Sequence, residues 1–177
     1  ELIDLGVDQV TVYQETYHPE QYLIYHLSGK KRQFEHRLNT MDRGGEAGFH
    51  RLNIGALLGL YDWRYEAIAL AHHVDYLQKK YWRSKLAISF PRIQKMKGQF
   101  NTLFPVRDHD LVQFIGMFRL LFPDIGISLS TREHPRLRDH LIPLGITDMS
   151  AESATNPGGY NCSDSESQFE LSDTRSL

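Results

Sequence analysis

The chain has 177 residues, enough for one domain with a substantial core. Its formal net charge of −2 provides no basic surface for nucleic acid, and no apolar run reaches the roughly 18 residues that span a bilayer. The single cysteine, Cys162, can neither close an internal disulfide nor hold a metal cluster alone. The N-terminal segment lacks the basic and apolar regions of a signal peptide and opens in the middle of a pattern. We therefore expect a cytoplasmic part of a longer protein, with no nucleic acid and no membrane among its partners.

Short apolar runs alternate with amphipathic stretches, which is typical of βα units around a parallel sheet. The helical spacing of Phe34, Leu38 and Met41 predicts a helix within residues 19–49. Strands are expected at residues 9–13, 51–56, 86–90, 126–130 and 144–149.

The clearest helix follows residue 62, where Asp62 can cap its N-terminus. Its expected apolar face consists of Ile68, Ala71, Val74, Leu77 and Tyr81. Further helices are predicted over residues 108–121 and from residue 135 onward. From residue 151 to 177 the composition shifts to Ser, Asp, Glu, Gly and Thr, so we expect a largely irregular segment after an α/β unit of residues 1–150.

A parallel sheet of five strands is compatible with an open doubly wound sheet or with part of a barrel, and periodicity does not choose between them. In both architectures the functional groups gather where the strands end. Polar or charged residues follow all five expected strands, which indicates a lined mouth.

Four of these positions have chemistry that fits a ligand. Glu15 directly follows a strand and could accept hydrogen bonds from ribose hydroxyls or an ammonium group, or could simply favour a helix N-terminus. Gly55 and Gly59 would let the backbone approach a flat ring, with Leu57 offering an apolar face. Arg132 could grip a carboxylate with its two-pronged guanidinium, or could pair with Glu133 or Asp139; Arg92 has the same choice.

Patterns typical of metal sites and nucleophilic catalysis are missing. The nine histidines lack zinc-ligand spacing, and neither a Gly-x-Ser-x-Gly elbow nor a phosphate-binding loop occurs. We therefore predict no metal ligands and no catalytic side chain in this chain.

Taken together, several strings are more specific than their parts. QETYHPEQY, MDRGGEAG, IGALLGLYDWR, SFPR, SLSTRE, SAESATNPGGY and QFELSD, in this order and spacing, resemble the tyrosine lyase family of radical S-adenosylmethionine (SAM) enzymes that serves thiamine biosynthesis. The resemblance runs from about Leu5 to the last residue. It implies a (β/α)8 TIM-like barrel, of which this chain supplies the C-terminal part, about strands four to eight.

The resemblance also implies a reaction. A 4Fe–4S cluster and SAM generate a radical, tyrosine is cleaved at its Cα–Cβ bond to 2-iminoacetate and p-cresol, and the iminoacetate passes to the thiazole synthase machinery. The site residues follow motif by motif. Those facing SAM are Glu15 at the ribose, Arg37 near the carboxylate, and Gly55, Leu57 and Gly59 at the adenine; those facing the substrate tyrosine are Arg132 at its carboxylate and Ser150 near its amine.

The chain departs from the family in one respect. The family's Cys-x-x-x-Cys-x-x-Cys loop is absent from this sequence, and Cys162 matches nothing in it. Because a cluster needs several thiolates, we expect this chain to be inactive alone. Two alternatives stay open: part of a hydrogenase-maturation tyrosine lyase, or a half-barrel that binds a ligand or partner without catalysis. Five barrel strands would leave two open edges, through which we expect self-association.

Overall fold

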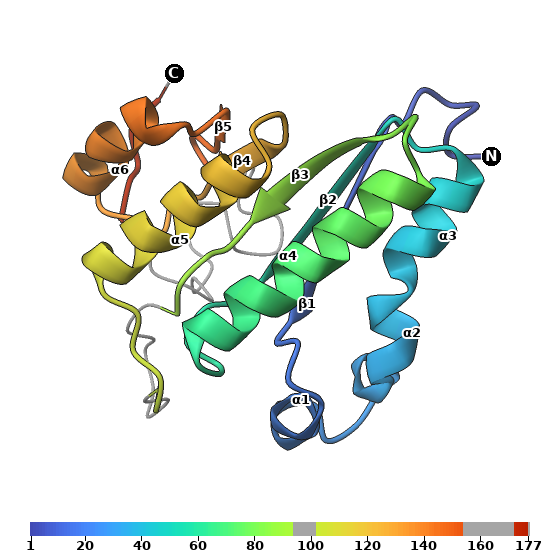
Figure 1. The fold of residues 1–177 in the computed structure, drawn as a ribbon, viewed down its shortest axis with the longest axis horizontal. Helices are drawn as coiled ribbons and strands as arrows, with labels where there is room; N and C mark the ends of the chain where they lie inside the picture. Colours follow the sequence, from blue (N-terminus) through green and yellow to red (C-terminus); the bar gives the residue numbers. More distant parts are fainter. Residues whose placement is uncertain (94–101, 154–171, 177) are drawn as a thin grey trace, which may run out of the picture.

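A computed structural model describes residues 1–93, 102–153 and 172–176 (Figure 1). Cys162 and most of the segment expected to be irregular lie outside the described residues. Within the described part of the chain, no helix combines the length and the apolar character needed to cross a membrane.

The described strands form one parallel sheet in the sequential order β1-β2-β3-β4-β5. Their bounds are β1 Gln9–Glu15, β2 Arg51–Ala56, β3 Lys85–Ser89, β4 Gly126–Leu129 and β5 Asp148–Met149. A doubly wound sheet would reverse its strand order part of the way along the chain. The unbroken order, with crossover connections of one hand, instead keeps the helices on one face, as in a barrel wall (Figure 1).

Helices connect the strands and cover that face. Their bounds are α1 Pro19–Tyr25, η1 Lys30–Arg32, α2 Phe34–Leu38, α3 Thr40–Ala47, α4 Trp63–Lys80, α5 Asp108–Leu121, α6 Pro135–Leu141 and η2 Ile142–Leu144. Asp62 caps α4 as predicted, because its side chain accepts a hydrogen bond from the Arg64 N–H at 2.8 Å. In Figure 1, α4 and α5 cross in front of the sheet, and α3 lies beside α4.

The core lies between the sheet and these helices. Alternate strand residues point toward the helices, and the buried ones include Leu52 and Ile54 of β2, Leu86 and Ile88 of β3, and Ile127 and Leu129 of β4. The opposite, concave face is polar. Asn53 and Ser89 form a buried hydrogen bond there at 3.1 Å. Polar groups on the inner face of a barrel wall are where a ligand would be expected.

Two details of the sequence prediction are wrong. The buried face of α4 is Ala67, Leu70, Val74 and Leu77, whereas Ile68 is 59% exposed. Val74 and Leu77 were placed correctly on the buried face, and Ala71 and Tyr81 are partly buried against the core, so only the expected position of Ile68 is wrong. The fifth strand is shorter than expected, since Leu144 belongs to η2 and Gly145, with φ of 102°, turns the chain before β5.

Candidate functional site

The end of β1 has an unusual backbone. Glu15 adopts a left-handed conformation with φ of 73°, which is rare for a residue with a side chain. The register between β1 and β2 shifts between Tyr13 and Glu15, so the strand bulges at this point. The Glu15 carbonyl accepts a hydrogen bond from the Leu57 N–H at 2.7 Å, which ties the bulge to the segment after β2.

The Glu15 carboxylate faces two cations. Arg37 of α2 donates to it at 2.9 Å and also donates to the Tyr13 carbonyl at 2.6 Å, while Lys31 lies 3.3 Å from the same carboxylate. The side chains of Glu15 and Arg37 are only 15% and 20% exposed. The structure therefore brings together Glu15, Arg37 and Leu57, three of the residues predicted to face SAM.

Gly55 near the end of β2 and Gly59 in the segment after it meet different constraints. A Cβ on Gly55 would lie 1.7 Å from the Ser89 carbonyl oxygen, so β2 and β3 approach closely only because the side chain is absent. Gly59 has φ of 112°, and its carbonyl accepts a hydrogen bond from the Thr102 hydroxyl. The segment from Gly55 to Gly59 is thus shaped by backbone requirements at both ends.

A buried carboxylate that contacts the turn after β1 was not singled out from the sequence. Glu66, in the first turn of α4, accepts hydrogen bonds from the Tyr17 N–H at 2.8 Å and from the Thr16 hydroxyl. Burial raises the pKa of Glu66 to about 7, against the lowering effect of these two hydrogen bonds. An acidic residue in the first turn of a helix is commonplace, so no sequence signal separated Glu66 from an ordinary helix-start charge.

The Tyr17 hydroxyl extends this buried cluster. It lies 2.8 Å from Nδ1 of His73, which is two turns along α4 from Glu66. Burial lowers the pKa of His73 to about 4, so the ring is neutral near pH 7. Burial, and then the charge of Glu66, raise the pKa of Tyr17 well above its usual value.

The ends of β1, β3, β4 and β5 enclose a small cavity of about 40 Å³. Its polar lining consists mainly of residues with hydroxyl groups, with one carboxylate from the β4–α6 segment. The polar lining residues are Tyr13, Ser89, Ser128, Ser130, Ser150 and Glu133.

Arg132 lies at the end of β4, next to this cavity. Burial lowers the pKa of its guanidinium, while Tyr13, Glu15 and Glu133 act in the opposite direction. The two acidic residues considered as its partners each contact another arginine: Glu133 forms a bidentate pair with Arg92, and Asp139 pairs with Arg175. Glu15 is therefore close enough to Arg132 to affect its pKa, which places the segments after β1 and β4 near each other.

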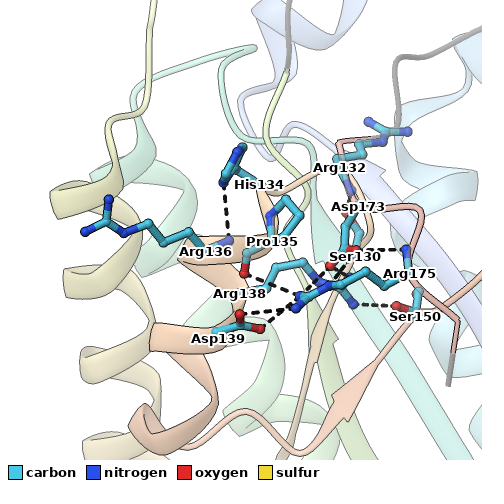
Figure 2. A network of polar contacts seen from close by, with 10 residues as sticks. All are labelled: Ser130, Arg132, His134, Pro135, Arg136, Arg138, Asp139, Ser150, Asp173 and Arg175. Carbon is cyan, nitrogen blue, oxygen red and sulfur yellow. Dashed lines mark hydrogen bonds and ion pairs between the residues drawn. The ribbon is translucent and has the colours of Figure 1, made fainter.

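Ser150 is held through its backbone. Its N–H donates to the Leu129 carbonyl at 3.0 Å, and its carbonyl accepts from Arg138. Arg138 also pairs with the buried Asp173, which Arg175 contacts at 2.8 Å (Figure 2). Figure 2 shows the Arg132 and Arg136 side chains pointing away from this network on opposite sides. Arg92, through Glu133, and Arg138, through the Ser150 carbonyl, therefore support the segments that carry Arg132 and Ser150. We call these ion-paired arginines the frame of the site.

Among the described residues, no group of three or more His, Cys, Asp or Glu side chains could hold a metal ion. The prediction for Cys162 lies outside the described residues.

Known proteins resemble this chain in both sequence and fold. The family model for the Biotin and Thiamin Synthesis associated domain matches residues 89–177. The chain is 50% identical to a 2-iminoacetate synthase from Salmonella typhimurium and 49% identical to one from Escherichia coli, in each case over 161 residues. These alignments cover 90% of this chain but only 43% of each relative, so the chain spans less than half the length of the curated proteins it matches.

Two solved structures are similar throughout the chain. A crystal structure of HydG, described as a maturase of the [FeFe]-hydrogenase, has a TM-score of 0.90 and 35% identity over 98% of this chain and 38% of its own. The HydG of Carboxydothermus hydrogenoformans has a TM-score of 0.86 and 37% identity over 96% of this chain and 40% of its own. These likenesses confirm the expected fold, an α/β sheet that forms part of a radical SAM barrel.

Proposed function

Because the chain belongs to the Biotin and Thiamin Synthesis associated domain family, we propose that it forms the SAM-facing and substrate-facing wall of a radical SAM tyrosine lyase. The reaction is the cleavage of tyrosine to 2-iminoacetate and p-cresol, which supplies the thiazole of thiamine. One observation carries the proposal: Glu15, Arg37, Gly55 and Leu57 converge where β1 and β2 end.

The SAM side of the mouth suits an adenosyl ligand. The Glu15 carboxylate can accept hydrogen bonds from a ribose diol, and Arg37 can pair with a carboxylate. The missing side chain at Gly55 lets β2 lie close to Ser89 of β3, and Leu57 after it could offer an apolar face to a flat ring. SAM, when bound, supplies the adenosyl group from which this family draws its hydrogen-abstracting radical.

The substrate side suits an amino acid. Arg132 would hold the tyrosine carboxylate, and Ser150 would accept a hydrogen bond from the amine. Both lie on a frame of buried ion pairs, which supports precise placement of a substrate relative to SAM.

The residues of this chain do not fit a 4Fe–4S cluster, because one cysteine cannot supply the thiolates. Radical generation therefore belongs to a protein that contributes such thiolates, and this chain alone should be inactive. Delivery of iminoacetate to the thiazole synthase machinery and a cytoplasmic location belong to the same proposal.

Two branches of the family are candidates. Identity of 50% to a 2-iminoacetate synthase, against 35% and 37% to the hydrogenase maturases, favours the thiamine branch.

The open edges of β1 and β5 favour self-association of the isolated chain. A monodisperse monomer by light scattering at high concentration would contradict that part of the proposal.

Isothermal titration calorimetry of the chain with SAM, and separately with tyrosine, tests the proposal. We expect Glu15→Gln to weaken SAM binding by about tenfold, as loss of a charged hydrogen bond would, and Arg132→Gln to weaken tyrosine binding by a similar factor. Matched controls are Glu20→Gln and Arg136→Gln, whose side chains are exposed outside the mouth. Binding of neither ligand, or equal losses in the controls, would overturn the assignment. The non-catalytic alternative would be favoured if a protein that also carries the cysteine loop bound SAM and tyrosine but did not cleave tyrosine.

A further inference from the structure

Glu66 accepts two hydrogen bonds, and both donors belong to one turn. The residue is fully buried, with 0% exposure, although it lies in the first turn of α4. Each of its carboxylate oxygens is used, one by the Thr16 hydroxyl and the other by the Tyr17 N–H. Both donors belong to the turn that begins directly after Glu15.

That turn holds Glu15 in a conformation that its own preferences disfavour. A left-handed φ in a residue with a side chain costs on the order of 1 kcal/mol and persists only where surrounding contacts impose it. Two contacts do so here: the Leu57 N–H bonds to the Glu15 carbonyl on one side, and Glu66 fixes Thr16 and Tyr17 on the other. The Thr16 hydroxyl also accepts from the His18 N–H at 3.1 Å, so the whole turn is connected to Glu66.

The surroundings of Glu66 do not compensate its charge. In the described ranges no lysine, arginine or histidine pairs with Glu66, and the capping residue Asp62 adds a second negative charge nearby. The remaining titratable groups of the cluster are Tyr17 and His73, which bond to each other. A carboxylate buried in these surroundings destabilises the fold. The structural role of Glu66 therefore lies in the two hydrogen bonds that it accepts from the turn.

We propose that Glu66 is a positioning residue that holds the turn after β1 so that the Glu15 carboxylate is presented to SAM. This inference rests on the proposed function, because it deepens the role assigned to Glu15. Glu66 does not touch the ligand and acts through Glu15.

The test is Glu66→Gln in the full chain, with SAM affinity and thermal unfolding both measured at pH 8. A glutamine amide has one acceptor oxygen, so it can satisfy only one of the two donors. We expect the dissociation constant for SAM to rise about tenfold, while the melting temperature stays equal or rises because a buried charge has been removed. Glu46→Gln on the exposed side of α3 is the matched control and should change neither quantity.

A thermodynamic cycle separates positioning from a general structural role. If Glu66 acts through Glu15, Glu66→Gln should have no further effect on SAM affinity in the Glu15→Gln background. Additive losses would overturn the proposal, as would unchanged affinity in Glu66→Gln alone.

A readout without ligand separates this proposal from the proposed function. Hydrogen exchange of the Leu57 amide reports its bond to the Glu15 carbonyl. We expect exchange at Leu57 to speed up about tenfold in Glu66→Gln, with the Ile88 amide in the sheet unchanged. If the chain binds no SAM but this change occurs, the proposed function fails and the positioning of Glu15 stands; unchanged exchange at Leu57 overturns the positioning.

Discussion

The two sides of the mouth are built by different physical means. On the side of β1 and β2, the functional groups are held by a strained backbone at Glu15, a close strand approach at Gly55 and one unpaired buried carboxylate, Glu66. On the side of β3 to β5, bidentate or buried ion pairs of Arg92 and Arg138 form the frame.

This difference separates the effects expected of substitutions. A backbone-built site can lose its geometry while the fold persists, because few other contacts depend on it. An ion-pair frame supports both site and fold, since breaking a buried pair leaves an uncompensated charge. We therefore expect side-chain substitutions at Glu15 and Glu66 to alter binding first, and those of the ion-paired residues near β4 to alter stability first.

The largest expected effect is on the β3 to β5 side. Glu133→Ala removes the buried partner of Arg92 and should lower the free energy of unfolding by about 4 kcal/mol. Among the described residues, the buried arginine would then keep only the exposed Asp108 as a charged partner. Urea denaturation measures this. Asp139→Ala, which breaks the exposed pair with Arg175, should cost no more than about 1 kcal/mol. Equal effects of the two would contradict the idea of a buried ion-pair frame.

On the β1 to β2 side, Gly55→Ala should lower the free energy of unfolding by about 3 kcal/mol. The added Cβ meets a backbone carbonyl, which cannot rotate away as a side chain could. Gly116→Ala in α5 is the control, because its Cβ would enter open space in a helix, and we expect a gain of about 0.5 kcal/mol. A tolerated Gly55→Ala would show that β2 and β3 can separate here at little cost.

The sequence predicted the strands on this side well, for a physical reason. Apolar runs and the turn residues after them are local, so residues 51–56 were placed as a strand with its true bounds, and Glu15 and Gly55 were placed at strand ends. The alternation of strands and helices could not choose between a barrel and a doubly wound sheet, because strand order is a long-range property. The sequential pairing of β1 through β5 identifies the sheet as part of a barrel.

What the sequence could not provide was the partner of each charge. Arg92 and Arg132 follow strands in similar ways, yet only Arg92 forms the bidentate pair with Glu133. On α4, Ile68 was expected on the buried face although it is exposed, and the depth of Glu66 was missed. Both errors concern which long-range neighbours a side chain meets. The family resemblance predicted the roles of Arg132 and Ser150, which remain to be tested by binding.

The titratable cluster beneath Glu15 provides a finer test. Glu66 has a raised pKa of about 7, so its burial favours the protonated form and destabilises the fold as pH rises toward 7. His73 has a lowered pKa of about 4, so the fold loses stability as pH falls from about 6.5 toward 4. Between pH 5 and 7 each group contributes about 2 kcal/mol, with opposite sign. The two contributions should nearly cancel in the unsubstituted chain.

Single substitutions should reveal these opposing slopes. In Glu66→Gln the free energy of unfolding should rise by about 2 kcal/mol between pH 5 and 7, whereas in His73→Asn it should fall by about as much. Asparagine can keep a polar atom near Nδ1 for the Tyr17 hydroxyl without titrating. Chemical denaturation across this pH range measures both slopes. Parallel curves for the two variants would show that these groups do not titrate as their burial requires.

The smallest expected effect concerns the link between the two sides. Arg51 of β2 and Asp148 of β5 form a bidentate pair across the concave face, with contacts of 3.1 and 2.5 Å, and Gly126 of β4 makes room for it because a Cβ there would lie 2.5 Å from the guanidinium. The pair is half-exposed, so Asp148→Asn should cost only about 1 kcal/mol, and the cost should shrink as salt is added. Asp75→Asn, which breaks the surface pair with Lys79 within α4, should cost about 0.3 kcal/mol. If Asp148→Asn also weakened SAM binding, curvature of the whole sheet would couple the two sides, and the separation between a backbone-built and an ion-pair-built side would fail.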